Sequence, residues 1–252
     1  MEVLILGGTT EASAVAAALA GDARIRPVLS FAGRTRAPVL PAIAARRGGF
    51  GGVDGLVTYL RTHDVAALID ATHPFAAQIS RNAVAAAAIA GVRLITVLRP
   101  QWTPCPGDRW TEVADMQAAV QALGTTPRRV FLTVGQQELA PFGLAPWHRY
   151  LIRSVEPPDP ALLPATAQYI AARGPFLEGD ELRLLEQEKI ETLVTKNSGG
   201  AATAPKLAAA RSLGIQVVMV ARLAAPPGET VPDAAGALAW LDHVVATWNR
   251  GV

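Results

Sequence analysis

The chain has 252 residues, of which half are hydrophobic and 17% are charged, and this composition excludes a disordered protein and a coiled coil. Its single cysteine, Cys105, excludes a disulfide framework and a multi-cysteine metal site, so we expect no metal. Lys and Arg number 23 against 21 Asp and Glu, and the sequence shows no clustered basic face, so we expect no binding to nucleic acid.

The sequence contains no membrane-spanning pattern. The longest apolar stretch, residues 83–90, is far shorter than the roughly 20 residues that a membrane helix needs. Glu2 and the absence of an early basic stretch argue against a secretory signal peptide. We therefore expect a cytoplasmic protein that does not bind a membrane.

Short apolar runs alternate with alanine-rich helical stretches in the first hundred residues. These runs are too apolar for strands with one face in water, and they favour a parallel sheet that helices cover on both faces. The alternation predicts βαβ units with right-handed crossovers. The predicted strands are 3–6, 26–30, 66–70 and 93–98, and the predicted helices are 10–20, 56–61 and 76–90.

Residues 100–107 interrupt this pattern with three prolines and a glycine, so we place a domain boundary there. The predicted domains are residues 1–100 and 101–252. The alternation resumes after the boundary, and we expect an α/β fold of two Rossmann-like doubly wound domains with mainly parallel sheets and a cleft between them. The predicted strands of the second half are 129–134, 150–154, 192–196 and 216–220, and its helices are 115–123, 178–188, 204–213 and 234–249.

A glycine-rich turn, Gly-Gly-Thr-Thr-Glu-Ala at residues 7–12, follows the first predicted strand. Such a turn lets backbone amides approach a pyrophosphate at a helix N-terminus, although the G-x-G-x-x-G pattern is not matched. We predict that Gly8, Thr9 and Thr10 contact a cofactor, with the Thr9 side chain able to donate to a phosphate. The alternative is an ordinary tight turn in which Thr9 or Thr10 caps the helix.

The loop after the second strand contains Ser30, Arg34 and Thr35 and no acidic residue. NAD-binding folds place an acid there for the ribose 2′-hydroxyl, whereas an arginine accommodates a 2′-phosphate. The three residues are therefore predicted cofactor contacts that favour NADPH, and the alternative is a solvated basic loop. In the glycine cluster at residues 47–52, Arg47 and Phe50 are predicted substrate contacts, because glycines permit close backbone approach and a flat ring could stack on Phe50. The alternative is a mobile surface loop.

The motif Asp-Ala-Thr-His-Pro-Phe-Ala at residues 70–76 lies at the carboxyl end of a predicted strand, where open α/β sheets bind ligands. Thr72 is a predicted cofactor contact and His73 the predicted catalytic residue, since histidine donates a proton or a hydrogen bond near neutral pH. Three roles compete for His73: proton donor, ligand hydrogen bond and helix cap. Thr72 or His73 is expected to cap the following helix, with Pro74 in its first turn.

Two strand ends of the second half also carry polar glycine turns. Thr133 and Gly135 are predicted cofactor contacts, whereas Lys196, Asn197 and Ser198 would suit a phosphate or a carboxylate and are predicted substrate contacts. The alternative is a structural turn that Ser198 caps. We expect both groups to face the same cleft as the loops of the first half. The sequence lacks the motifs of P-loop enzymes, serine-elbow hydrolases and zinc proteases.

Seven motifs occur in order along nearly the whole chain. They are Gly-Gly-Thr-Thr-Glu-Ala, Ser-Phe-Ala-Gly-Arg, Gly-Gly-Phe-Gly-Gly, Asp-Ala-Thr-His-Pro-Phe-Ala, Phe-Leu-Thr-Val-Gly, Tyr-Ile-Ala-Ala-Arg-Gly-Pro-Phe and Val-Thr-Lys-Asn-Ser-Gly-Gly. Together they resemble the precorrin-6A reductase family of cobalamin biosynthesis. The resemblance implies NADPH-dependent reduction of one double bond of the tetrapyrrole precorrin-6A, giving precorrin-6B, and two Rossmann-like domains with cofactor and substrate between them. One departure is Leu223, which follows Arg222 where the family tends to have proline.

Two other classes of function keep the same glycine loops. One is a transferase that uses a nucleotide sugar or a methyl donor on the same two-domain frame. The other is a ligand-binding sensor without chemistry. Only a reductase would bind NADPH and change the absorbance of a tetrapyrrole.

Overall fold

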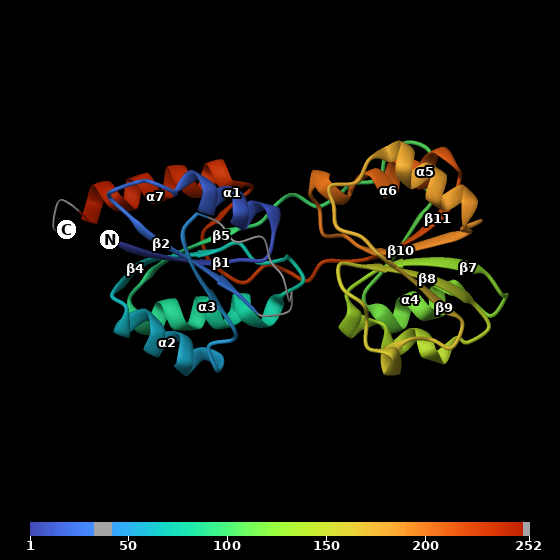
Figure 1. Cartoon of the computed structure of the whole chain (residues 1–252), viewed down its shortest axis with the longest axis horizontal. Coiled ribbons are helices and arrows are strands. Elements are labelled where there is room, and N and C mark those ends of the chain that lie inside the picture. Colours follow the sequence, from blue (N-terminus) through green and yellow to red (C-terminus); the bar gives the residue numbers. More distant parts are fainter. Residues whose placement is uncertain (33–41, 249–252) are drawn as a thin grey trace. The chain divides into compact units, whose positions relative to one another are not determined.

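The computed structural model describes residues 1–32 and 42–248. The chain divides into two compact units (Figure 1), and each is described here by itself. Unit 1 consists of Met1–Pro100 together with Leu223–Val252, and unit 2 consists of Gln101–Arg222. No helix among the described residues is both long and apolar enough to span a membrane.

Unit 1 contains a six-stranded sheet in the order β12-β5-β4-β1-β2-β3, in which every neighbouring pair is parallel. The five strands β3-β2-β1-β4-β5 have the order of a dinucleotide-binding Rossmann sheet, which reverses direction between β1 and β4. The strands are β1 (Glu2–Leu6), β2 (Arg26–Phe31), β3 (Ala44–Arg47), β4 (Val65–Asp70), β5 (Arg93–Val97) and β12 (Thr230–Val231).

Two helix pairs cover this sheet, α1 (Thr10–Ala18) with α7 (Ala234–Trp248) on one face and α2 (Gly52–Thr62) with α3 (Ala77–Ala90) on the other (Figure 1). Successive side chains of a strand point to opposite faces. Val3 and Ile5 of β1 accordingly join the core under α1 and α7, whereas Leu4 and Leu6 join the core under α2 and α3. Burial on both faces explains why β1 is apolar from Val3 to Leu6.

Unit 2 repeats this architecture with a six-stranded parallel sheet in the order β6-β11-β10-β7-β8-β9. Helices α5 (Glu178–Gln187) and α6 (Pro205–Ser212) cover one face, and α4 (Met116–Leu123) lies on the other (Figure 1). The strands are β6 (Trp110–Val113), β7 (Arg129–Thr133), β8 (Arg149–Ser154), β9 (Ala167–Ala171), β10 (Thr192–Lys196) and β11 (Gln216–Val220). Short 3₁₀ turns are η1 (Gln136–Glu138), η2 (Ala140–Leu144), η3 (Pro160–Leu162) and η4 (Ala201–Thr203).

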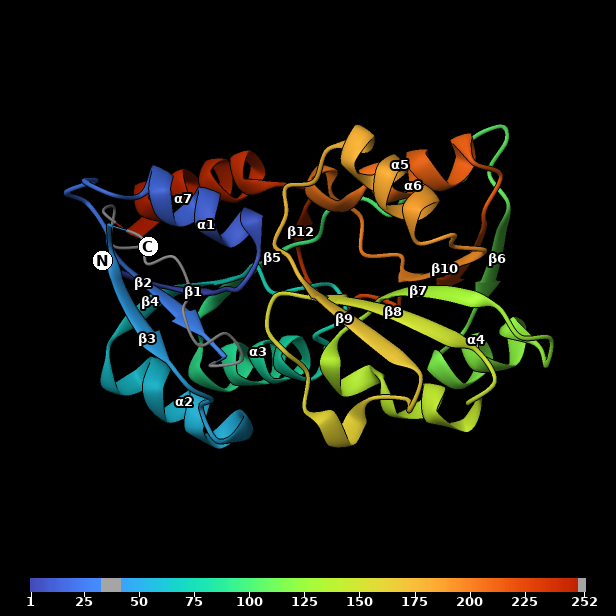
Figure 2. The same cartoon turned by 45° about the vertical axis from the view of Figure 1, so that its right-hand side comes forward.

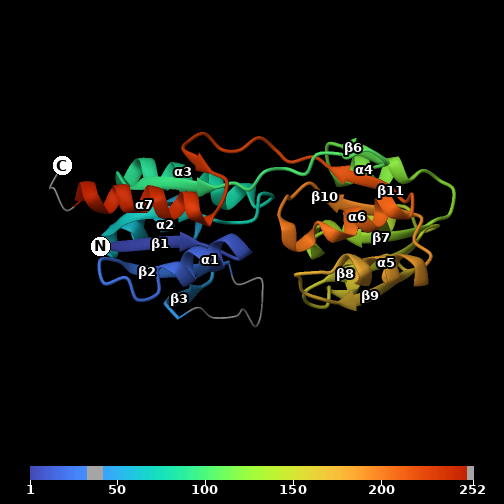
Figure 3. The same cartoon turned by 90° about the horizontal axis from the view of Figure 1, so that it is seen from above.

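The sixth strand of unit 1 comes from the end of the chain. The chain leaves unit 2 at Arg222 and returns to unit 1, where β12 pairs with β5 through the bonds Thr96 N–Glu229 O and Leu98 N–Val231 O, 3.0 and 2.8 Å long. Figures 2 and 3 show β12 and α7 with the rest of unit 1. The prediction that residues 101–252 form one domain is wrong for residues 223–252, because α7 buries Leu241, Val244 and Val245 in the core of unit 1. The predicted cleft between the domains stays a prediction.

A buried ion pair joins β8 to α5 in unit 2. The Arg153 guanidinium donates to both carboxylate oxygens of Glu181 at 2.5 and 3.0 Å, and both side chains are less than 10% exposed. The guanidinium carbon also lies 3.8 Å from the ring centroid of Phe176. Removal of either partner would leave an uncompensated buried charge, so this pair fixes α5 on the sheet.

His148, immediately before β8, is a buried titratable group. Its Nε2 lies 3.1 Å from the carbonyl oxygen of Gly124, and its Nδ1 has no hydrogen-bond partner among the described residues. Burial lowers the pKa of His148, the Gly124 carbonyl raises it in part, and nearby Arg128 lowers it further. Together these effects lower the pKa of His148 below its ordinary value, so the folded chain favours the neutral imidazole ring.

We therefore predict that the free energy of unfolding falls as the pH drops below about 6.5, because the unfolded state takes up the His148 proton first. The stabilisation that His148 contributes is fully present above that pH. Below it, the free energy of unfolding falls by at most about 1.4 kcal/mol per pH unit because of His148. Denaturant unfolding of wild type and His148→Gln between pH 5 and 8 measures it. A slope that is the same in both proteins would contradict the prediction.

Candidate functional site

A cavity of about 540 Å³ opens at the carboxyl ends of the strands of unit 1. Its volume lies within the range of small-molecule sites, and its position at the point where strand order reverses is where open α/β sheets bind ligands. Turns after β1, β2, β3 and β4 and the start of α3 contribute the lining. The lining residues used below are Gly7, Gly8, Ser30, Gly48, Gly49, Phe50, Gly51, Gly52, Thr72 and His73.

Hydrogen bonds between neighbouring strand ends fix the turn after β1. The Gly7 amide donates to the Ser30 carbonyl at 2.9 Å, and the Ala71 amide donates to the Leu6 carbonyl at 3.0 Å. A Cβ at Gly7 would lie 2.5 Å from Leu29 Cδ1, so a larger residue there would require the buried Leu29 side chain to move. The Thr9 hydroxyl donates to the Ala71 carbonyl at 2.7 Å and joins the turns after β1 and β4.

Thr9 is also the N-cap of α1, since its hydroxyl oxygen accepts the Ala12 amide at 3.1 Å. This is the capping alternative that the sequence offered. Because the hydroxyl proton goes to the Ala71 carbonyl, the Thr9 side chain has no proton for a phosphate. Thr10 is exposed and donates to Glu11, whose carboxylate lies 2.9 Å from Arg99 Nη1 at the end of β5. Burial raises the pKa of Glu11, but its own backbone amide and Arg99 hold the pKa below its usual value.

Four glycines that line the cavity have backbone conformations that side chains rarely adopt. Their φ angles are +117° at Gly8, +108° at Gly48, +83° at Gly51 and +91° at Gly52. An added Cβ at any of them would meet no atom within 4 Å. The backbone of the turn before α1 and of the turn before α2 is therefore open to a ligand, as an extended dinucleotide requires.

Arg46 on β3 organises the wall of the cavity at the end of β2. Ser30 and Arg46 are register partners, and Arg46 Nη1 donates to Ser30 Oγ at 2.8 Å and to the Gly48 carbonyl at 3.1 Å. Arg46 Nη2 donates to the Gly49 carbonyl at 3.2 Å, and the guanidinium carbon lies 3.8 Å from the Phe50 ring centroid. The sequence reasoning missed Arg46 because it did not predict β3, which brings this side chain to Ser30.

A hydroxyl network runs behind the turn after β4. The Thr72 amide and hydroxyl both donate to Asp70 Oδ1, at 3.1 and 2.7 Å. Ser80 Oγ lies 3.3 Å from Thr72 Oγ1, and since the Thr72 proton goes to Asp70, Ser80 must be the donor of this contact. Asp70 is buried, and its Oδ2 has no partner among the described residues. Thr72 therefore presents a hydrogen-bond acceptor to the cavity.

His73 lines the same cavity in a closed turn. The Phe75 amide donates to His73 Nδ1 at 3.2 Å, and the Ala76 amide donates to the His73 carbonyl at 2.7 Å. An amide can only donate, so Nδ1 is the acceptor and the neutral ring carries its proton on Nε2. The prediction that Thr72 or His73 caps the helix is wrong, because α3 begins at Ala77 and its N-cap is Ala76. Pro74 precedes the helix for the same reason.

In unit 2, a side chain of the protein occupies the position that corresponds to the open turn of unit 1. The Gly135 amide, just after β7, donates to Glu138 Oε2 at 2.8 Å, and Lys196 Nζ donates to the same oxygen at 2.7 Å. A Cβ at Gly135 would lie 2.9 Å from that oxygen. The Glu138 carboxylate thus fills the anion position between β7 and β10, and no sequence signal identified it.

The remaining predicted residues lie in several environments. The buried Asn197 amide group pairs with the backbone of Trp102, at 2.8 Å to its N and 3.0 Å to its O, and Ser198 is buried beside it. Thr133 donates to the Val194 carbonyl at 3.3 Å, within the sheet. Arg47 ends β3 and does not line the cavity. Arg34 and Thr35 lie outside the described residues. No cluster of three or more potential metal ligands occurs in residues 1–32 and 42–248.

The fold defines a two-unit α/β protein, and unit 1 has a glycine-lined cavity at the carboxyl ends of its strands. A family model described as precorrin-6x reductase CbiJ/CobK matches residues 2–242, so the chain belongs to that family of reductases. It is 50% identical over 244 residues to a precorrin-6A reductase of Sinorhizobium sp, covering 97% of this chain and 94% of that protein.

A precorrin-6A reductase of Rhodobacter capsulatus is also 50% identical, over 250 residues that cover 99% of both chains. A solved structure named CobK precorrin-6A reductase superimposes with a TM-score of 0.92 at 48% identity and covers 97% of both chains. The chain is therefore an enzyme of the precorrin-6A reductase family of cobalamin biosynthesis, as the sequence motifs suggested. The transferase and sensor alternatives are not favoured.

We predict that Gly8→Ala weakens binding of a dinucleotide by about tenfold or more, because the added methyl group projects into the cavity. Gly21→Ala is the matched control, since Gly21 also has a positive φ, +89°, and open space at its Cβ position but lies outside the cavity. Both variants should lose roughly 1–2 kcal/mol of stability through backbone strain. Equal loss of dinucleotide affinity in the two variants, measured by calorimetry, would contradict the assignment of the cavity.

Proposed function

We propose that this chain reduces one double bond of precorrin-6A with NADPH, giving precorrin-6B, and that the dinucleotide binds in the cavity of unit 1. Reductases of this family use a nicotinamide cofactor. The observation that carries the proposal is the cavity at the carboxyl ends of β1, β2 and β4, which glycine backbones line at the point where strand order reverses. We further propose that the enzyme works in the cytoplasm.

Ser30 and Arg46 support NADPH as the form of the cofactor. Ser30 stands at the end of β2, where NAD-binding folds use an acid to bind the ribose 2′-hydroxyl. The Arg46 guanidinium donates to Ser30 Oγ, so the hydroxyl proton of Ser30 remains for a ligand oxygen. A hydroxyl donor with a guanidinium group beside it suits a phosphate, because a fully ionised phosphate can accept hydrogen bonds but cannot donate them. Arg34 and Thr35, which follow the same strand in the sequence, are proposed as further contacts of the 2′-phosphate.

Thr72 and His73 offer complementary hydrogen bonds to the other parts of the ligand. Thr72 presents an acceptor, and because His73 Nδ1 accepts the Phe75 amide, a neutral His73 ring carries its proton on Nε2. The bound nicotinamide supplies the hydride, so these residues need only orient the ligands. We propose that His73 binds ligand, and we rank proton donation below this role.

The substrate is a large macrocycle fringed with carboxylates. Arg47, Phe50, Lys196, Asn197 and Ser198 remain our proposed substrate contacts, and Thr133 and Gly135 remain proposed cofactor contacts. Lys196 would have to exchange the Glu138 carboxylate for a carboxylate of the substrate. The Asn197 amide is bonded to Trp102, so its contribution would be to hold the turn beside Lys196.

The proposal is tested by mixing the purified protein with precorrin-6A and NADPH. We expect the absorbance of NADPH and of the macrocycle to change together, with one NADPH oxidised for each macrocycle reduced. Oxidation of NADPH without a change in the macrocycle, or binding of NADPH without any reaction, would contradict the assigned activity.

Arg34→Ala should weaken NADPH binding by about 1.5–3 kcal/mol and leave NADH binding unchanged, because the variant loses a charge-assisted bond to the 2′-phosphate. Dissociation constants of both cofactors for wild type and variant test this. An equal loss for NADH and NADPH would show that Arg34 does not contact the 2′-phosphate.

His73→Asn should raise the Michaelis constant and leave turnover nearly unchanged if His73 only binds ligand. A proton donor would instead lose about 10²–10⁴-fold in turnover. Single-turnover hydride transfer and substrate affinity, measured between pH 6 and 9, distinguish the two roles. If neither quantity changes, His73 has no part in the site.

A further inference from the structure

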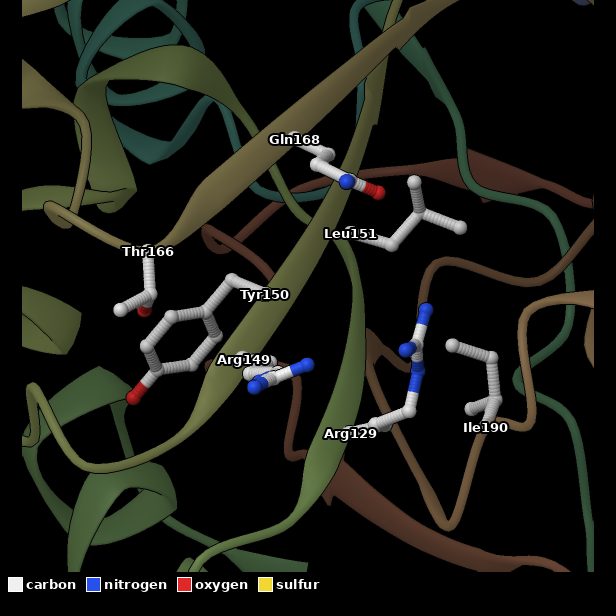
Figure 4. A pocket seen from close by; sticks show the side chains of 7 residues that line it. All are labelled: Arg129, Arg149, Tyr150, Leu151, Thr166, Gln168 and Ile190. Atoms are coloured by element: carbon white, nitrogen blue, oxygen red, sulfur yellow. The ribbon is translucent and has the colours of Figure 1, made fainter.

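Unit 2 contains a second, smaller cavity, lined by none of the residues that we propose for the reductase site. Its volume is about 60 Å³, and Arg129, Arg149, Leu151, Gln168 and Ile190 contribute to its lining. Figure 4 shows Arg129, Leu151 and Ile190 on one side of the strands, with the Tyr150 ring directed away from them. Arg129 and Arg149 begin β7 and β8, so the cavity lies at the amino ends of these strands, opposite to the carboxyl ends that hold Thr133 and Lys196.

The charges at this cavity are unbalanced. Arg129 and Arg149 are register partners on adjacent parallel strands, and strands of a sheet are about 4.8 Å apart. Like charges directly opposite each other in a sheet destabilise it. Arg129 has a carboxylate partner, Glu188, at 2.9 Å, whereas the Arg149 guanidinium makes no ion pair with another described residue. Arg149 is exposed, so its charge is accessible to an anion from solvent.

The residues that line the cavity limit which anion could bind beside the two arginines. Leu151 and Ile190 are 5% and 6% exposed and form an apolar wall, which strengthens a charge interaction beside it. Gln168, the register partner of Leu151, adds a side-chain amide. A volume of 60 Å³ holds about four waters, which suits a small oxyanion and excludes a dinucleotide or a tetrapyrrole. The planar guanidinium group matches the oxygens of a phosphate.

We propose that this cavity is a binding site for a small oxyanion of the phosphate class, which bridges Arg129 and Arg149 and stabilises unit 2 at a distance from the reductase site. The anion supplies a counter-charge between β7 and β8. The site is independent of the proposed function, because none of its residues is placed in the cofactor or substrate site.

The test is thermal unfolding of the full chain in inorganic phosphate at constant ionic strength, with chloride as the balancing ion. Wild type should show a saturating rise of Tm, and Arg149→Gln should weaken the apparent phosphate affinity about 10–100-fold, as expected for loss of a charge-assisted bond. Without phosphate, Arg149→Gln should have a Tm equal to or above that of wild type, because it removes a like-charge contact. A Tm of Arg149→Gln below that of wild type without phosphate would contradict the like-charge contact between Arg129 and Arg149.

Arg183→Gln is the matched control, since Arg183 is an exposed arginine of α5 that pairs with Asp180 outside this cavity. It should respond to phosphate as wild type does. The proposal is overturned if Arg149→Gln retains the wild-type response, or if Arg183→Gln loses it to the same extent. A parallel titration with glycerol 3-phosphate distinguishes free phosphate from a phosphate monoester as the ligand, and NADPH affinity should be unchanged in Arg149→Gln.

Discussion

The structure of the site depends on the close approach of three strand ends in unit 1. The Thr9 hydroxyl bonds to the Ala71 carbonyl, and the Gly7 amide bonds to the Ser30 carbonyl, so the turn after β1 is fixed to the ends of both β4 and β2. This geometry favours glycine at position 7, where a Cβ would displace the Leu29 side chain. The bond from Thr9 to Ala71 also explains why a threonine replaces the second glycine of the usual dinucleotide motif, because its side chain joins two turns. The glycines at 8, 48, 51 and 52 provide the open backbone instead.

The two units have the same strand order but differ at the anion position. In unit 1 the backbone beside Gly8 faces a cavity, and the nearby hydroxyls have fixed polarity, with Ser30 able to donate and Thr72 able to accept. In unit 2 the corresponding amide of Gly135 and the cation of Lys196 share the Glu138 carboxylate. One topology therefore presents an open anion site in one unit and an internally neutralised one in the other, which favours a division of labour between cofactor and substrate.

The central strands of both sheets could be predicted from the sequence because burial on both faces makes their middle residues apolar. The four strands that the sequence did not reveal, β3, β6, β9 and β12, are the edge strands of the two sheets. Their exposed residues interrupt the apolar runs; β3, for example, is Ala-Ala-Arg-Arg. The return of residues 223–252 to unit 1 could not be predicted either, since an apolar helix such as α7 fits the core of either sheet. Arg46 was missed because its partner Ser30 lies on another strand. Glu138 was missed because its contacts with the Gly135 amide and with Lys196 form only in the folded chain.

The central claim is that the dinucleotide occupies the cavity of unit 1. Hydrogen exchange of backbone amides with and without saturating NADP⁺ tests it most directly. The account predicts protection of the backbone amides at residues 7–10, 48–52 and 71–76, which border the cavity. Protection at residues 134–139 with none at residues 48–52 would contradict it.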